Sequence, residues 1–118
     1  MKQVIVMRKD LNMRKGKMIA QGAHASLKVV IENLATMRKN DPLDQWLRGI
    51  FTKIVVSVDS EDELLEAVAM AKFMNIKHAL IKDAGVTEFK GVHTLTCCAI
   101  GPDISSKIDQ ITGRMKLL

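Results

Sequence analysis

Four polar side chains recur at helical spacing in the first third of the chain: Lys17, Gln21, His24 and Lys28. Residues three and four positions apart lie along one face of a helix, so these groups form one polar strip. A solvated helix face would show the same spacing. The basic run Arg14-Lys15-Gly16-Lys17 favours a second interpretation. At a helix start, unpaired N–H groups and nearby cations favour binding of a phosphate or an oxyanion.

A carboxylate stands directly after an apolar segment later in the chain. Asp83-Ala84-Gly85 follows residues 78–81, which we expect to be a strand. A carboxylate at the carboxyl end of a strand can face the crevice in which α/β proteins bind ligands. The same Asp could instead stabilise a turn by bonding to its own backbone, and the tripeptide leaves both interpretations open. Hydroxyl groups lie nearby in the sequence at Thr87, Thr94 and Thr96.

The segments that must position these groups alternate between strand and helix patterns. Short apolar runs predict strands at residues 3–7, 52–58, 78–81 and 94–100, and periodicity predicts helices at residues 17–38 and 43–48. A third helix follows the capping-box pattern of Ser60 and Glu63, and a fourth begins near Pro102 and ends at Gly113. The order predicts a single three-layer-like α/β domain over residues 1–118, with a small four-stranded mixed sheet and helices on both faces.

Three of the four predicted helices carry a stripe of apolar residues on one face, which we expect to face the sheet. The stripe of the first helix consists of Ile19, Ala23, Leu27, Val30 and Leu34. The stripe of the third consists of Leu64, Leu65, Val68, Ala71 and Met74, and that of the last consists of Ile104, Ile108 and Ile111. Small residues between Ala20 and Ser26 further indicate that the first helix packs closely against its sheet.

Composition narrows the classes of function. The 118 residues are 47% hydrophobic, which suffices for one core, and the net charge of +5 favours a polyanionic partner. Since no apolar run approaches the roughly 20 residues that span a bilayer, we expect no membrane partner. The N-terminal residues lack the pattern of a signal peptide, which predicts a cytoplasmic protein. With three Phe, one Trp and no Tyr, base-stacking platforms are not expected.

Metal and acyl-enzyme chemistry are not indicated. The cysteines Cys97 and Cys98 are adjacent in an apolar run, a spacing that suits neither a disulfide framework nor a zinc site, so we expect buried thiols. The three histidines are dispersed, and we expect no metal and no cofactor. The chain has neither a Walker A loop nor a G-x-S-x-G elbow, which argues against a nucleotide triphosphatase and an acyl-enzyme hydrolase.

Several motifs in fixed order resemble the type 2 peptidyl-tRNA hydrolase family. They are Arg8-x-Asp10-Leu11, Met13-x-Lys15-Gly16-Lys17-x-x-Ala20-Gln21-x-x-His24-Ala25, Asp83-Ala84-Gly85-x-Thr87, Ala99-Ile100-Gly101-Pro102, and the closing Ile111-Thr112-Gly113-x-x-Lys116-Leu117-Leu118. The resemblance covers nearly the whole chain. The combination of the second and third motifs makes it specific.

The resemblance implies hydrolysis of the ester that links a peptide to the 3′ end of tRNA, without a metal or an organic cofactor, by a domain that commonly forms homodimers. It implies functional roles for Lys17, Gln21, Asp83, Thr87 and Thr96. We expect Lys17 to stabilise an oxyanion or hold a terminal phosphate, and Asp83 to position the attacking water and accept or relay its proton, with Gln21 and the threonines as orienting groups. A basic patch, made of Arg8, Lys9, Arg14, Lys15 and Lys28 beside Lys17, would contact the tRNA phosphates.

The sequence departs from the family pattern around Thr87. Val86 stands where the family usually has a basic residue, and the stretch 88–93 replaces the usual loop and is one residue longer. Counting back from Gly101 favours Thr96 over Thr94 as the family's threonine. The changed loop leaves one alternative open: a catalytically inactive or re-purposed member that binds tRNA, another RNA or a protein through the same basic face.

Overall fold

The computed structural model describes residues 1–85 and 89–118, which fold into strands and helices in nearly the predicted order. The elements are β1 (Lys2–Arg8), α1 (Lys15–Asn33), α2 (Pro42–Arg48), β2 (Lys53–Val58), α3 (Glu61–Phe73), β3 (His78–Asp83), β4 (Thr94–Asp103), α4 (Ser105–Thr112) and β5 (Lys116–Leu117). The α/β class predicted from the alternation of patterns is therefore confirmed.

The described strands form one mixed sheet in the order β3-β4-β1-β2-β5. β1 runs parallel to β2, and β4 is antiparallel to both β1 and β3. The prediction of four strands was wrong, because β5 pairs antiparallel with Val56 and Ser57 at the far edge. A strand of two residues has no alternation that a sequence pattern could detect.

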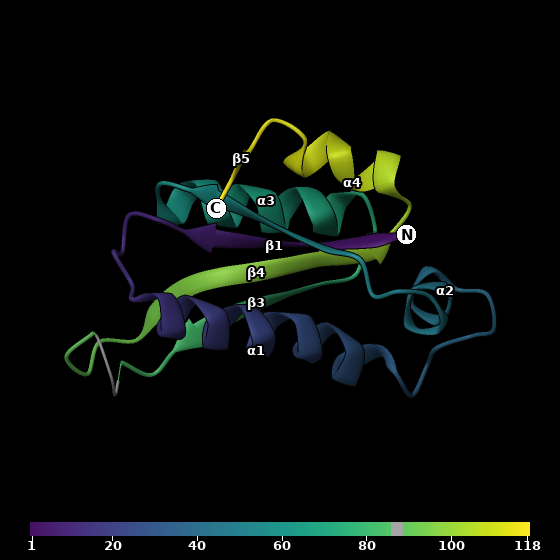
Figure 1. Ribbon diagram of the computed structural model, residues 1–118, viewed down its shortest axis with the longest axis horizontal. Helices are drawn as coiled ribbons and strands as arrows, with labels where there is room; N and C mark the ends of the chain where they lie inside the picture. The colour runs from purple at the N-terminus through teal and green to yellow at the C-terminus, as the bar shows by residue number, and fades with distance from the viewer. Residues whose placement is uncertain (86–88) are drawn as a thin grey trace.

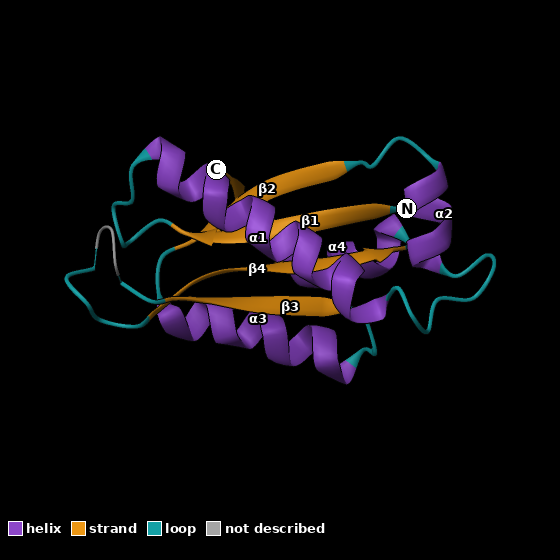
Figure 2. Cartoon of the chain, turned by 90° about the horizontal axis from the view of Figure 1, so that it is seen from below, coloured by secondary structure: helices purple, strands orange, loops and turns teal. Residues whose placement is uncertain are grey.

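Helices cover both faces of this sheet, as predicted. α3 and α4 lie on one face and α1 on the other (Figure 1), and Figure 2 shows α1 running along the sheet. Because successive residues of a strand point to opposite faces, β1 contributes to two separate cores. Val4 and Val6 pack with α3 and α4, whereas Ile5 and Met7 pack with α1.

The close packing of α1 that its small residues predicted is confirmed, but its expected apolar stripe does not face the sheet. Two residues of its expected apolar stripe, Ile19 and Leu27, are 72% and 57% exposed. The buried residues are instead mostly small or polar: Gln21, Gly22, Ala25, Ser26 and Val29. A Cβ placed on Gly22 would lie 3.7 Å from Ile5 and Met7, so the helix backbone approaches β1 closely and its larger apolar residues turn outward.

The ends of the helices follow local hydrogen bonding. α1 ends at Asn33 rather than at residue 38, and the Asn33 side chain donates a 2.7 Å bond to the carbonyl of Val29. The Ser60 side chain caps α3 by accepting from the Glu63 N–H at 3.1 Å, as predicted.

Two apolar residues expected to face the sheet are exposed instead. Leu65 on α3 is 37% exposed and Ile104, which precedes α4, is 52% exposed, whereas Ile108 and Ile111 are buried as predicted. Among the described residues, no helix is long and apolar enough to cross a membrane.

Candidate functional site

The carboxylate of Asp83 lies where β3 ends, and two side chains of α1 reach it. Lys17 Nζ donates to Asp83 Oδ1 at 2.7 Å, and Gln21 Nε2 donates to the same oxygen at 3.4 Å. The side chains of Lys17 and Asp83 are only 13% and 12% exposed. Partial burial strengthens an ion pair because less water screens it. The polar strip on the first helix and the carboxylate after the third strand, 66 positions apart for Lys17 and Asp83, therefore form one site.

The second oxygen of Asp83 fixes the turn that follows it. Asp83 Oδ2 accepts a 2.8 Å bond from the Gly85 N–H. Gly85 has φ +81°, and a Cβ there would come within 2.5 Å of the Val92 carbonyl, so this position requires glycine. The turn interpretation of the Asp-Ala-Gly tripeptide is thus confirmed, while the other carboxylate oxygen holds the ion pair with Lys17.

These contacts keep Asp83 ionised. The hydrogen bond from Lys17 is the largest cause that lowers the pKa of Asp83, and the Gly85 N–H lowers it further against the opposing effect of burial. The charge of His24 also contributes to the lowering. His24 is exposed and lies one turn beyond Gln21, on the same face of α1. At neutral pH the site therefore presents an anion paired with a cation.

Thr96 fixes the orientation of the Gln21 side chain. Its Oγ1 donates a 2.5 Å bond to Gln21 Oε1, and Thr96 is completely buried. Because the amide oxygen accepts from Thr96, the amide nitrogen is the atom that faces Asp83. Thr94 is not in this network, since its hydroxyl bonds to the Val92 carbonyl at 3.0 Å. The sequence alignment that favoured Thr96 over Thr94 therefore agrees with the geometry, whereas Thr87 lies outside the described residues.

The residues of the predicted basic patch differ in their exposure and in their contacts. Lys9, Arg14 and Lys15 are exposed around the start of α1. Arg8 is held by neighbours: its guanidinium bonds to Asp10 and to the Leu95 carbonyl, the latter at 2.9 Å, and its side chain is 11% exposed.

Phe89 borders the site, whereas Lys28 contacts β3 away from it. Lys28 lies farther along α1, and its Nζ donates to the Leu80 carbonyl at 3.3 Å. Phe89, which the sequence analysis did not single out, has its ring centre 5.8 Å from Lys17 Nζ. The available signal was an aromatic residue just beyond the Asp-Ala-Gly turn in a chain with three Phe.

Neither cysteine lies where it could act as a nucleophile. Cys97 and Cys98 are buried in β4, and burial raises the pKa of Cys97 to about 11. Burial also raises the pKa of Cys98. Within residues 1–85 and 89–118 there is no cluster of three or more His, Cys, Asp or Glu side chains that could hold a metal ion.

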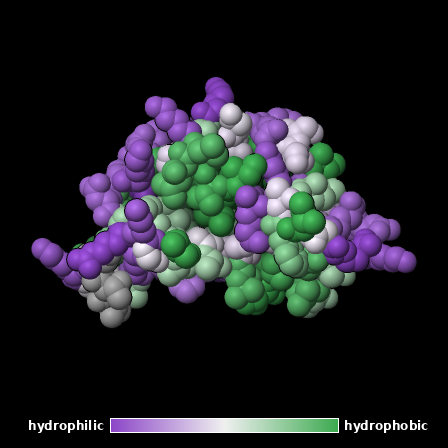
Figure 3. Space-filling view, viewed as in Figure 1, coloured by the Kyte–Doolittle hydropathy of each residue, from purple (hydrophilic) through white to green (hydrophobic). Residues whose placement is uncertain are grey.

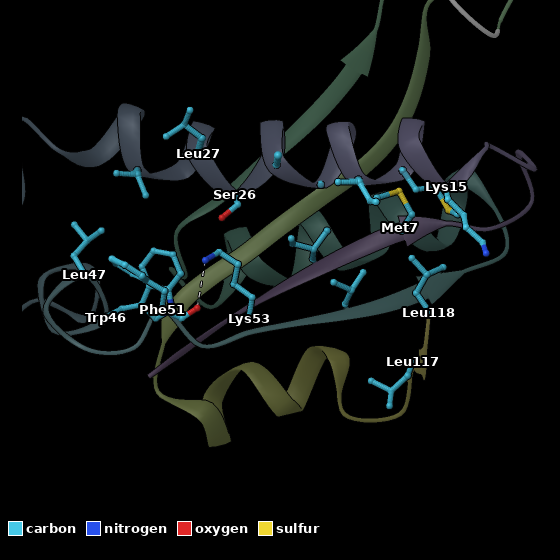
Figure 4. Close-up of a pocket in the computed structure, with 17 residues that line it drawn as sticks. Met7, Lys15, Ser26, Leu27, Trp46, Leu47, Phe51, Lys53, Leu117 and Leu118 are labelled. Carbon is cyan, nitrogen blue, oxygen red and sulfur yellow. Dashed lines mark hydrogen bonds between the residues drawn. The ribbon is translucent and has the colours of Figure 1, made fainter.

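A second surface lies on the β2 side of α1. It is an apolar groove of about 950 Å³ between α1, the side of β1 and β2 that faces α1, α2 and the C-terminal residues. Figure 4 shows Trp46, Phe51 and Lys53 at one end of the groove and Lys15 and Leu118 at the other. Figure 3 shows hydrophobic side chains gathered in the centre of this side of the molecule and again low in the view, over the C-terminal half of α1.

Sequence comparisons with known proteins identify one family. The family model described as peptidyl-tRNA hydrolase PTH2 matches residues 1–118. Proteins named peptidyl-tRNA hydrolase from Methanocaldococcus jannaschii and Methanothermobacter thermautotrophicus are 45% and 44% identical to the chain, and each alignment covers 100% of both chains. A solved structure of a protein of unknown function from Agrobacterium tumefaciens strain C58 has a TM-score of 0.62 at 12% identity, covering 99% of this chain and 96% of the other. That likeness shows the fold alone.

Proposed function

Because the chain belongs to the peptidyl-tRNA hydrolase PTH2 family, we propose that it hydrolyses the ester between a peptide and the 3′ end of tRNA, releasing free peptide and free tRNA. The observation that carries the proposal is the connected network of Lys17, Asp83, Gln21 and Thr96. It combines a fixed cation, an ionised carboxylate and an oriented amide, which are groups that ester hydrolysis can use without a metal or an organic cofactor.

Lys17 supplies positive charge where negative charge develops. When water attacks the ester carbonyl, its oxygen becomes an oxyanion that a nearby fixed cation stabilises. In the free protein Asp83 holds the Lys17 ammonium at the end of β3, so the charge is already positioned before substrate arrives. An ammonium carries three N–H donors, so one lysine can contact a carboxylate and an ester oxygen at the same time.

Asp83 positions the attacking water. A carboxylate offers about four lone-pair sites, and three of those on Asp83 accept bonds from Lys17, Gln21 and Gly85. We assign the fourth to the water, whose oxygen attacks the carbonyl carbon while its proton is accepted or relayed by Asp83. The lowered pKa makes Asp83 a weak base, which favours a relay that delivers the proton to the departing ribose oxygen.

Gln21 and Thr96 act as a pair. Gln21 directs its second amide N–H towards the water or the ester carbonyl. Thr96 is completely buried and acts through Gln21, so it is a positioning residue. Thr87 completes the set proposed from the family motif.

The tRNA contacts are assigned to the basic patch. Arg8, Lys9, Arg14, Lys15 and Lys28 surround the N-terminal half of α1 or lie on the same face as Lys17, and the net charge of +5 attracts a polyanion. Phosphate contacts of this kind release counterions, so binding should weaken as salt increases.

We place the protein in the cytoplasm, where translation takes place, and assign it a homodimer built on α1. The exposed residues Ile19, Leu27 and Ile31 are 72%, 57% and 65% exposed. They form an exposed apolar ridge along α1, and two of them, Ile19 and Leu27, also line the groove on the β2 side of this helix. An apolar ridge that continues into an apolar groove suits a two-fold interface, because the same surface of both copies can pack together. Contiguous exposed apolar patches often mark interaction surfaces.

The decisive test is release of labelled peptide from peptidyl-tRNA by the purified protein in the presence of a chelator. The wild type and the control Asp59→Ala, an exposed carboxylate that follows β2, should cleave equally. Asp83→Ala and Lys17→Ala should each lose at least about 100-fold in kcat while remaining folded. A folded wild type that binds tRNA without cleaving it would overturn the proposal. Full activity in either site variant would overturn the assigned roles.

A further inference from the structure

β3 is an edge strand whose outward-facing groups can be identified from its pairing. The Gly101 N–H donates to the Lys77 carbonyl at 2.7 Å, so residues 77 and 101 form a hydrogen-bonded pair. The antiparallel register continues from His78 opposite Ile100 to Ile81 opposite Cys97. Since hydrogen-bonded and non-hydrogen-bonded pairs alternate, residues 79 and 81 bond to β4, whereas His78 and Leu80 turn their backbone N–H and C=O groups away from the sheet.

One contact confirms this direction independently. The Leu80 carbonyl accepts its 3.3 Å bond from Lys28 of α1, which does not belong to the sheet. Within residues 1–85 and 89–118, no strand pairs with this side of β3, which Figure 2 shows at the edge of the sheet. Lysine side chains commonly prevent exposed strand edges from pairing with other strands. Lys28 therefore covers a backbone acceptor that is open to a competing strand.

The open edge leads directly into the site. β3 runs from His78 to Asp83, and Asp83 is the residue that pairs with Lys17. In the proposed substrate the reacting carbonyl belongs to the last residue of the peptide. A peptide laid along β3 in parallel orientation would bring that last residue to Asp83. An antiparallel peptide would bring its first residue there instead, so the chemistry selects the parallel direction.

We propose that the peptide part of the substrate adds to the sheet as a strand parallel to β3, with its backbone bonded to His78 and Leu80 and with Lys28 displaced. The proposal rests on the proposed function. If the reacting residue lies opposite Asp83, the peptide residue about three positions upstream lies opposite Leu80, and that about five positions upstream lies opposite His78, at ~3.3 Å per residue. Peptides of about six residues would therefore use the whole edge.

Recognition through the peptide backbone would not depend on the sequence of the peptide. Backbone N–H and C=O groups are the same for nearly every residue, so an added strand gains affinity without selecting a side-chain sequence. The groove on the β2 side of α1 would act differently, because its lining is apolar and would favour apolar peptide side chains. Binding along β3 would therefore depend on the peptide backbone, whereas binding in the groove would depend on the peptide side chains.

The test measures kcat/KM for peptidyl-tRNAs that carry alanine peptides of one to six residues, each with an acetylated N-terminus. We expect kcat/KM to rise with length up to about six residues. Single N-methyl groups, scanned along the six-residue peptide, should then lower kcat/KM about 3- to 10-fold at alternate positions only, because only every second residue of an added strand faces β3.

The outcomes separate this proposal from the proposed function. Equal kcat/KM for all lengths, or N-methyl effects without a period of two, would overturn the added strand while leaving the hydrolase intact. Failure to cleave any of these substrates would overturn the proposed function. A preference for leucine over alanine peptides with no N-methyl effect would move the peptide to the apolar groove.

A variant of the strand gives a second measurement. His78→Pro removes one outward N–H at the first position of β3, where proline is tolerated in an edge strand. This substitution should lower the ratio of kcat/KM for the six-residue substrate to kcat/KM for the one-residue substrate about 3- to 10-fold. An unchanged ratio in a folded variant would count against pairing at His78. If this variant does not fold, the N-methyl scan still decides the question.

Discussion

Replacing Thr96 by valine tests whether the buried hydroxyl controls the reaction through Gln21. Valine keeps the shape of the side chain in β4 but removes the 2.5 Å bond to Gln21 Oε1. Gln21 is 3% exposed, so water does not readily replace the lost donor. An unsatisfied buried acceptor costs about 1–3 kcal/mol. The amide can avoid this cost by rotating, but its oxygen would then face the ionised Asp83.

Either response should lower kcat more than it changes KM. A loss of about 1.4 to 2.8 kcal/mol from the transition state corresponds to a decrease in kcat of about 10- to 100-fold. Steady-state cleavage of peptidyl-tRNA measures kcat and KM. Thermal unfolding measures the loss of stability, because each kcal/mol lowers the melting temperature by ~4 °C in a chain of this size.

The matched control is Thr96→Ser, which keeps the hydroxyl and loses a methyl group. It should retain most of the wild-type kcat while losing about 1 kcal/mol of stability through the small cavity. A purely structural role would make the two variants differ in stability but not in kcat. Wild-type kcat in Thr96→Val would refute the claim that Thr96 orients Gln21.

Three further expectations concern ionisation and assembly. In the native protein, iodoacetamide at pH 8 should modify Cys97 far more slowly than a free thiol, because burial raises its pKa to about 11; a rate typical of free cysteine would contradict its burial. Asp83→Asn should be less stable than the wild type at pH 7, and the gap should shrink as pH falls below about 4. The ion pair lowers the pKa of Asp83, so its contribution is present above the unfolded value of about 3.9 and is lost as pH falls through the folded value. Urea unfolding at several pH values checks this, and a gap that does not depend on pH would refute it. Ile31→Glu should shift the protein from dimer to monomer in sedimentation, because it places a charge on the exposed ridge of α1; a persistent dimer would exclude that ridge from the interface.

The sequence predicted the parts of the site better than their connection. Helical spacing placed Lys17 and Gln21 on one face, and the turn pattern placed Asp83 at the end of a strand. Each of these is a local property of a few neighbouring residues. The ion pair between Lys17 and Asp83 depends on the strand order and on how α1 crosses it, which no local pattern contains. The family motif supplied the connection by placing both residues in one set.

The errors have a common physical origin. A periodic stripe shows that one side of a helix is apolar but does not show what covers that side. Ile19 and Leu27 were expected against the sheet, yet where α1 comes closest to β1 the helix has the small residues Gly22 and Ala25. The fifth strand was missed for a related reason, since Lys116 and Leu117 gain their strand conformation only by pairing with β2.

The close packing of α1 against β1 explains how one helix can contribute to the sheet contact, the site and the exposed ridge. Its small residues Gly22, Ala25 and Ser26 face the sheet and hold the helix backbone close to β1. Lys17 and Gln21 can then reach Asp83 on the β3 side, while Leu27 and Ile31 remain outside on the ridge. An apolar stripe packed inward would have placed larger side chains between helix and sheet and moved α1 away from Asp83. The exposed ridge is therefore a consequence of the geometry that brings the lysine and the carboxylate together.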